Sequence, residues 1–372
     1  MSAEMPRGCR ACGAAGLVRV LDLGKMPAAD DFPLLDAPDT PPNPLAMDQC
    51  PACGLAQLAE DDTVTSEPRG VEPQALRDQA AAALVEVDAA GWLNAHTARE
   101  FGSPHGGSWL PLLQSRGCTV TEKPADVVID CFGIMHEPDQ RAAFHERAAA
   151  TAADGVLLLQ FHSLAAIVGH GQWNALRHGH FAYYTLRTLR LLLAAAGMRV
   201  AAAWEFGLYG GTVLVAAVHG PAELGSAPAD PVVNRILDAE SALFGTDSET
   251  AAIAVRTLQQ AADDQGRTLR AWLERENASG HRVFAYGAAS RAVALLHLAG
   301  VHRSLLTAVA DASPAKQGRR MPGTDVPIIA PSELVAAQPD RVLLTLPDLL
   351  PEVRTQWPEL EGRWVLNPTV HD

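Results

Sequence analysis

The chain has 372 residues, of which 48% are hydrophobic and 19% are charged, so it is long enough for two or three domains with sizeable cores and too apolar to be disordered. Its net charge of −14 argues against a nucleic-acid backbone as a partner. No apolar run reaches the length of a membrane span and the first residues show no signal-peptide pattern, so we expect a soluble cytoplasmic protein.

Two C-x-x-C pairs, CRAC and CPAC, stand near the start of the chain, and each is followed by Gly. Two such pairs supply four thiolates in a tetrahedron, which suits zinc, and a small segment rich in Pro, Ala and Asp needs a staple of this kind. The alternatives are a redox pair or chance spacing. Because four protein ligands leave no open position, we expect a structural zinc site whose ligands are Cys9, Cys12, Cys50 and Cys53.

A helix is predicted from about residue 75 to 99, and the stretch EFGSPHGG follows at residues 100–107. We expect EFG to end a strand, SPHGG to turn and SWLPLL to begin a helix. Glycines in such a turn let the backbone approach a ligand, and the helix N-terminus adds a positive dipole. Many strand–turn–helix units carry similar glycines. The candidate ligand-binding residues here are Glu100, Gly102 and Gly106.

The run DVVIDCF predicts a buried strand, and GIMHEPD follows it at the end where open α/β sheets place their sites. His136 stands in this stretch. A helix, another strand, and finally two strands expected to pair as a hairpin come next, so the sheet should end mixed. His178 and His180 flank a glycine just before a helix, next to Tyr183 and Tyr184.

Long amphipathic helices are predicted from residue 228 to 278. The remainder alternates between strands and helices, which is typical of a parallel sheet. Its first tight turn, YGAAS, can present backbone N–H groups to an anion. Lys316, Arg319 and Arg320 lie in a later loop and are candidates to meet phosphates, with a solvated surface as the alternative.

The order of these motifs resembles the three-part C-methyltransferases that act on nucleotide-linked keto-deoxysugars in antibiotic pathways. CRACG…LDLGKMPAADDF…CPACGLAQL is similar to the family's zinc module, and EFGSPHG is similar to its cofactor loop, usually E-I-G-S-N-D-G. YGAASR and DASPAKQGRRMPGTDVPI are similar to its C-terminal signature. The resemblance implies an α/β fold in four parts: a zinc module (1–70), a truncated methyltransferase-like Rossmann domain (71–220), a helical bridge (221–280) and a C-terminal Rossmann-like domain (281–372).

The resemblance also implies a chemistry. A base removes the proton beside a keto group, and the enolate carbon then attacks the methyl group of S-adenosylmethionine; histidine suits the base. His136 matches a histidine after the family's fourth strand, and RHGH at 177–180 matches its Y-H-E-H run. The implied catalytic residues are His136, His178, His180 and Arg177. The implied substrate-binding residues are Tyr183, Tyr184, Ser290, Arg291 and Lys316, the last three toward a nucleotide diphosphate or the domain interface.

Two departures from the family pattern stand out. The Tyr and Glu of its Y-H-E-H run are Arg177 and Gly179 here. Between Gly106 and Asp126 the chain has room for one helix and a short strand, so the strand and helix that usually cover ribose and adenine are predicted to be missing. Glu122 would then stand where the ribose-binding acid does. A bound cofactor would need another wall, for which GWLNAHTARE and FHSLAAIVGHGQW are the nearby candidates.

Three functions stay open at this point. The first is methyl transfer from S-adenosylmethionine to a carbon of a nucleotide-linked sugar or a related metabolite. The second is an epimerase, isomerase or lyase that kept proton abstraction and lost the cofactor, with Arg177 stabilising an enolate oxygen. The third is a non-catalytic partner of another enzyme.

Overall fold

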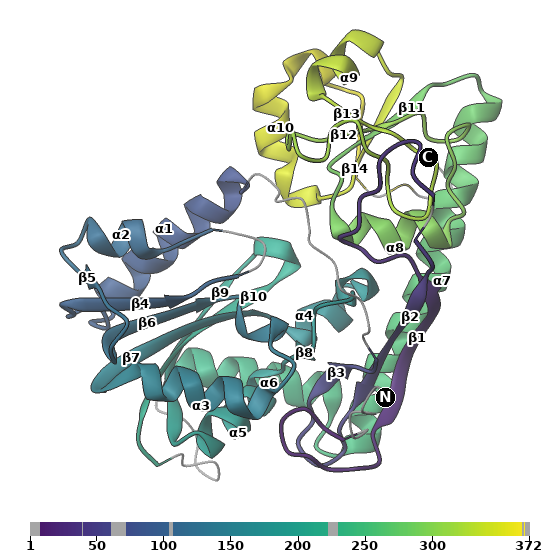
Figure 1. The fold of residues 1–372 in the computed structure, drawn as a ribbon. Coiled ribbons are helices and arrows are strands. Elements are labelled where there is room, and N and C mark those ends of the chain that lie inside the picture. Colours follow the sequence, from purple (N-terminus) through teal and green to yellow (C-terminus); the bar gives the residue numbers. More distant parts are fainter. Residues whose placement is uncertain are drawn as a thin grey trace.

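The computed structural model describes residues 8–38, 40–60, 72–103, 107–221, 230–366 and 368. These residues form three β-sheets joined by helices, which confirms the predicted α/β class. In Figure 1 the C-terminal sheet lies above the middle sheet, and the N-terminal strands run along one side of both. No helix in the described part of the chain is both long and apolar enough to cross a membrane.

The N-terminal sheet has the strand order β1-β2-β3-β8 and is antiparallel. Its strands are β1 (Val18–Met26), β2 (Asn43–Gln49), β3 (Ala56–Leu58) and β8 (Ala182–Tyr183). Because β8 comes from the segment after the middle sheet's β7, this sheet ties the start of the chain to its centre. The β1–β2 hairpin packs along helix α7 (Ser248–Ala278), as Figure 1 shows.

The middle sheet has the order β5-β4-β6-β7-β10-β9, with β5, β4, β6 and β7 parallel and β10 antiparallel to both neighbours. The predicted terminal hairpin is therefore confirmed. The strands are β4 (Thr97–Phe101), β5 (Thr119–Val120), β6 (Ala125–Cys131), β7 (Thr151–His162), β9 (Met198–Phe206) and β10 (Thr212–His219). The helices are α1 (Gln74–Ala89), α2 (Leu110–Gln114), α3 (Gln140–Ala150), α4 (Leu164–Gly169) and α5 (Leu186–Ala195), with short 3₁₀ turns η1 (Ile134–His136), η2 (Trp173–Ala175) and η3 (Leu208–Gly210).

The sheet is shortened where the sequence predicts a deletion. Helix α2 has five residues and β5 has two, and β5 is the last strand beyond β4 among the residues the structure describes. The helix predicted to residue 99 is too long, because α1 ends at Ala89 and strand β4 begins at Thr97. Gly91 follows the helix end, and the β4 residues pair with β6 in the parallel sheet, so tertiary pairing overrides the helical pattern there.

Two helices, α6 (Pro231–Phe244) and α7, lead to the C-terminal sheet. This sheet is fully parallel, in the order β13-β12-β11-β14-β15. Its strands are β11 (Val283–Tyr286), β12 (Val309–Ala310), β13 (Ile328–Ile329), β14 (Arg341–Leu344) and β15 (Trp364–Val365). Its helices are α8 (Ser290–Leu298), α9 (Pro331–Ala337) and α10 (Leu350–Gln356), with 3₁₀ turns η4 (Pro347–Leu349) and η5 (Pro358–Leu360).

Candidate functional site

The four N-terminal cysteines meet in one cluster, in which all four Sγ atoms lie within 4.8 Å of one another. The Cys9–Cys53 and Cys12–Cys50 Sγ distances are 3.5 and 3.6 Å. A tetrahedral zinc with Zn–S bonds of about 2.3 Å would need S–S separations of about 3.8 Å, so the donor set fits zinc closely. The glycines after the two pairs, Gly13 and Gly54, have φ of 75° and 79°, as the turn under a metal requires.

A cavity of about 390 Å³ opens between the middle and C-terminal sheets. It is bordered by residues at the carboxyl ends of β4, β6 and β7 on one side and of β11, β12 and β14 on the other. Loops at these ends of parallel strands are where α/β proteins place ligands. The arrangement therefore puts one ligand-sized space against two Rossmann-like sheets at once.

The cofactor-loop motif borders one end of this cavity. Glu100 Oε1 accepts a hydrogen bond from Trp109 N at 2.6 Å, and Oε2 accepts one from Ser108 Oγ at 2.5 Å. Burial raises the pKa of the Glu100 carboxyl although both hydrogen bonds oppose this shift. At Gly102 an added Cβ would meet no described atom within 4 Å, so the described structure leaves the backbone open there, and Gly102 lines the cavity.

Two other predicted cofactor residues are not brought into this geometry. Gly106 lies outside the described residues. Glu122 is exposed and is absent from the described residues that line the cavity, and its backbone oxygen accepts a hydrogen bond from Arg99 at 2.9 Å. Their assignment to the cofactor stays a prediction.

The wall beside the cofactor loop comes from segments that the sequence reasoning missed. Glu72, two residues before α1, and Glu352 of helix α10 both line the cavity. Glu352 Oε2 accepts a hydrogen bond from Gln74 N at 3.1 Å. A carboxylate of α10, which follows strand β14, therefore caps the N-terminus of α1. Nearby, Asp348 Oδ2 accepts from Tyr209 N at 2.7 Å. Of the two candidate wall segments, only Glu100, the last residue of the first, and His162, the second residue of the second, are among the described residues that line the cavity.

The three predicted histidines separate in space. His180 lines the cavity, whereas His136 and His178 are not among its described lining residues. His136 Nδ1 lies 2.9 Å from Gly179 O, so it donates its proton there, and its ring is edge-on to that of His180 with centroids 4.4 Å apart. His178 Nε2 lies 3.0 Å from Pro44 O of β2. This hydrogen bond connects the His178 ring to the N-terminal sheet.

Arg177 lies between His180 and the C-terminal sheet. Its Nε donates to His180 Nε2 at 2.7 Å, and its Nη1 donates to Ser290 Oγ at the start of α8. Because guanidinium only donates, His180 Nε2 is the acceptor in this geometry. Arg177, His180 and Ser290 all line the cavity, as does Tyr183. Tyr184, in contrast, is fully buried, donates to Gln140 Oε1 and is absent from the described lining.

Arg291 is a partly buried cation that lines this cavity. Its Nη2 lies 3.1 Å from His162 Nδ1, and its guanidinium carbon lies 5.0 Å from the centre of the Tyr209 ring. No carboxylate among the described residues lies within ion-pair distance of its guanidinium, although Asp348 acts on it electrostatically from farther away. Burial, and then the nearby charge of Arg177, lower the pKa of Arg291 to about 10, so a bound anion would stabilise its charged form.

His162 is a cavity residue that the sequence reasoning did not single out. Because its Nδ1 accepts from Arg291, the neutral ring carries its proton on Nε2. Burial and the charge of Arg291 hold the pKa of His162 well below its usual value. A signal existed, because His162 ends strand β7 at the same edge of the sheet that singled out His136.

The three basic residues of the loop between β12 and β13 do not share one environment. Lys316 lines the cavity, donates to Ala288 O at 3.0 Å and lies 4.5 Å from the centre of the Phe32 ring. Arg319 donates to Phe32 O at 2.7 Å and Arg320 to Ala37 O at 2.9 Å. Arg319 and Arg320 are absent from the described residues that line the cavity and donate to carbonyl oxygens of the N-terminal loop, so the phosphate contacts predicted for them stay a prediction.

The turn YGAAS also borders the cavity. Gly287 has φ of 96°, and an added Cβ would lie 2.6 Å from Thr345 Oγ1, so only glycine fits. Ala288 N donates to Asp311 Oδ2 at 2.7 Å, which fixes the turn on the neighbouring strand end. Ser290 and Arg291 follow directly as the first residues of α8.

Comparisons with known proteins agree with the resemblance drawn from the motifs. Residues 207–367 match a family model described as "C-methyltransferase C-terminal domain", and residues 9–66 match one described as "putative zinc binding domain". Together with the four-thiolate cluster, the second match confirms the predicted zinc site.

One curated relative and several solved structures are also similar. The chain is 28% identical over 242 residues to the C-methyltransferase NovU of Streptomyces niveus; the match covers 63% of this chain and 55% of that protein, so the chain spans about half the length of that relative. The mitomycin 7-O-methyltransferase MmcR matches with a TM-score of 0.30 and 18% identity over 40% of this chain and 59% of its own. The magnesium protoporphyrin IX methyltransferase of Synechocystis PCC 6803 matches with a TM-score of 0.29 and 13% identity over 39% of this chain and 84% of its own.

Proposed function

We propose that this chain, which is similar to zinc-containing C-methyltransferases in its N-terminal and C-terminal domains, transfers a methyl group from S-adenosylmethionine to a carbon of a small molecule. The acceptor is a nucleotide-linked keto-deoxysugar or a related metabolite of antibiotic-type secondary metabolism, and the protein acts in the cytoplasm. Both model matches and the similarity to NovU support the reaction class.

The observation that carries the proposal is a single cavity with two chemically different ends. The end at β4 carries the carboxylates Glu72, Glu100 and Glu352 and the open backbone of Gly102. Carboxylates and exposed backbone suit the ribose hydroxyls and the ammonium group of S-adenosylmethionine. The residues at this end therefore fit the cofactor, although Glu122, which the resemblance matches to the family's ribose-binding acid, is absent from the described lining.

The opposite end is cationic. Arg177, Arg291 and Lys316 line it, together with the turn that precedes α8. Guanidinium groups and backbone N–H groups at a helix start are the partners that phosphates prefer. We assign the diphosphate of a nucleotide-linked substrate to this end, which would place the sugar between the two ends, beside His180.

In this proposal, side chains of this chain remove the proton beside the keto group of the substrate. When S-adenosylmethionine is bound, it supplies the electrophilic methyl group. His180 lies at the cavity and is the base in this proposal, with His136 packed edge-on against its ring. Because His180 Nε2 accepts from Arg177, it takes the substrate proton when the guanidinium turns to the keto oxygen. Arg177 then stabilises the enolate oxygen that forms.

A second function is favoured by one specific observation, the loss of the sheet beyond β5. An enzyme that had given up the cofactor would need neither that wall nor a ribose-binding acid. It would still remove the proton beside a carbonyl and give epimerisation, isomerisation or elimination.

A binding titration separates the two. Zinc-loaded protein is titrated with S-adenosylmethionine and S-adenosylhomocysteine in a calorimeter, and bound protein is then tested for transfer of a deuterated methyl group to nucleotide-linked keto sugars. We expect binding near micromolar affinity and a mass gain on carbon. Absence of binding by both compounds would contradict methyl transfer, and proton exchange of the same sugars in D₂O would then test the alternative.

A further inference from the structure

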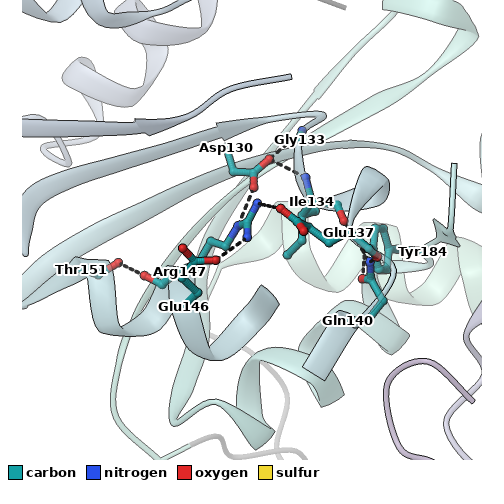
Figure 2. Close-up of polar contacts among 9 residues, drawn as sticks. All are labelled: Asp130, Gly133, Ile134, Glu137, Gln140, Glu146, Arg147, Thr151 and Tyr184. Carbon is teal, nitrogen blue, oxygen red and sulfur yellow. Dashed lines mark hydrogen bonds and ion pairs between the residues drawn. The ribbon is translucent and has the colours of Figure 1, made fainter. Parts of the chain in front are cut away.

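A buried polar network lies beneath the turn that follows β6 (Figure 2). Asp130, near the end of β6, is fully buried. Its Oδ1 accepts from Gly133 N at 2.7 Å and from Ile134 N at 2.9 Å, and its Oδ2 accepts from Arg147 Nε at 2.9 Å. One carboxylate therefore fixes the first turn of η1 and binds it to helix α3.

Arg147 extends this network in two directions. Its side chain is 1% exposed, and its Nη2 donates to Glu137 Oε1 at 3.2 Å on the far side of η1. Its guanidinium carbon lies 4.1 Å from the centre of the Phe101 ring, at the end of β4. The same cation thus lies under the turn after β6 and under the cofactor loop.

Gln140 holds the turn from its other end. Its Nε2 donates to Ile134 O at 2.9 Å and to Glu137 O at 2.7 Å, while its Oε1 accepts from the hydroxyl of Tyr184. Figure 2 shows Tyr184 and Gln140 on the side of η1 opposite Asp130. In this geometry Tyr184 acts on the turn through Gln140, which explains its distance from the cavity.

The turn held in this way carries side chains of the site. Phe132 and Met135 line the cavity, and the ring of His136 packs on that of His180. An added Cβ at Gly133 would lie 3.2 Å from Gly102 O and 3.3 Å from Phe101 O. The turn is therefore in close contact with the cofactor loop. Its position therefore sets the spacing between that loop and His180.

We propose that Asp130, Arg147 and Gln140 are positioning residues, which hold the turn after β6 so that the cofactor loop and His180 keep one fixed separation. A buried ion pair adds little stability over apolar side chains of the same size, so a role in geometry is the better reason for these charges. The inference rests on the proposed function for its kinetic consequence but not for its structural one.

The test uses a matched pair of buried carboxylates. Glu240 of α6 is also buried and accepts from two backbone amides, Leu186 N at 2.6 Å and Arg187 N at 3.0 Å, but it does not line the cavity in the described structure. Asp130→Asn and Glu240→Gln each replace one acid by its amide. For Asp130→Asn we expect kcat of methyl transfer to fall at least about tenfold with KM changed by less than about threefold, since small misplacements of reacting groups cost up to about 100-fold. Glu240→Gln should keep both constants.

A spectroscopic measurement makes the test independent of activity. In wild-type protein labelled with ¹⁵N-histidine, His136 should show one tautomer, protonated on Nδ1, because that atom donates to Gly179 O. Asp130→Asn and Gln140→Leu should broaden this signal or mix the tautomers, whereas Glu240→Gln should not. Tyr184→Phe removes only the bond to Gln140 and serves where a larger change prevents folding; its kcat should fall about two- to fivefold.

The outcomes separate the two proposals. Wild-type protein that neither binds S-adenosylhomocysteine nor methylates would contradict the proposed function, and the histidine signals would still decide the positioning role. Active Asp130→Asn with wild-type kcat and an unchanged His136 signal would overturn the positioning role alone. Equal losses in Asp130→Asn and Glu240→Gln would overturn it too, because they would reflect stability rather than geometry.

Discussion

The two ends of the cavity satisfy their charges in opposite ways. At the β4 end, Glu100 and Glu352 are each held by donors of the chain itself, Ser108, Trp109 N and Gln74 N. At the α8 end, Arg291 is partly buried near the charge of Arg177, and its described side-chain partner is a neutral histidine, His162. The first end can stay folded and satisfied without a ligand, while the second gains most when an anion arrives. The ligand of the α8 end should therefore stabilise this protein more than the ligand of the β4 end.

The largest effect should come from Arg291→Gln. Loss of a charge-assisted contact in the cavity should weaken binding of a nucleotide-linked sugar about 100-fold, about 2.7 kcal/mol, while S-adenosylhomocysteine affinity changes less than about twofold. Calorimetric titration of both ligands measures this. Arg319→Gln is the matched control, because Arg319 donates to Phe32 O and does not line the described cavity. Equal losses of affinity for both ligands would show that the two ends of the cavity do not bind separate ligands.

Gly102→Ala should act at the other end. Its Cβ would meet no described atom within 4 Å, so folding should be kept while S-adenosylhomocysteine binding weakens about tenfold by steric conflict. Gly169→Ala, whose added Cβ likewise meets no atom of the described residues within 4 Å, is the control for stability. Titration gives the affinities and thermal unfolding the stability. Unchanged cofactor affinity would mean that the ligand does not lie against this loop.

Glu352→Gln should weaken the contact between α10 and α1 at the β4 end. The carboxylate caps α1 from α10, so its amide should reduce S-adenosylhomocysteine affinity about three- to fivefold, in line with the ~1 kcal/mol typical of a helix cap. The exposed Glu359 of η5 provides the control Glu359→Gln. Hydrogen exchange of α1 should rise in Glu352→Gln and stay unchanged in the control; equal exchange in the two variants would contradict a capping role.

The smallest effect is a pH dependence confined to the β4 end. Burial raises the pKa of Glu100, so this carboxyl takes up a proton sooner than an ordinary one as pH falls. A pKa raised by folding means that protonation stabilises the folded protein, so weaker binding at low pH would not reflect unfolding. We expect S-adenosylhomocysteine affinity to fall about threefold from pH 7 toward pH 5, and binding of a diphosphate ester to stay constant. Glu100→Gln should remove the pH dependence, and a persistent slope would point to another group.

Local pattern was enough to predict much of the fold. The cysteine spacing identified the zinc ligands, and the short interval before Asp126 predicted the missing part of the sheet, because a crossover has a minimum length. The site was harder to predict, since its cavity joins segments far apart in sequence. Nothing near Glu352 indicates that it would cap α1, and RHGH gives no sign that His178 would turn to Pro44 while His180 faces the cavity. His162 was within reach of the strand-end argument that found His136.

The β1–β2 hairpin has a consequence for anyone exchanging parts between such proteins. Its sheet is completed by β8 at one end, it lies along α7, and the loop it carries occupies Arg319 and Arg320 and covers Lys316 with the Phe32 ring. A chimera that takes the C-terminal segment from a relative and the N-terminus from this chain would therefore place the β1–β2 loop against a basic loop of different sequence. Recombination at the helical bridge should yield folded hybrids only when the hairpin loop and the basic loop are inherited from the same parent.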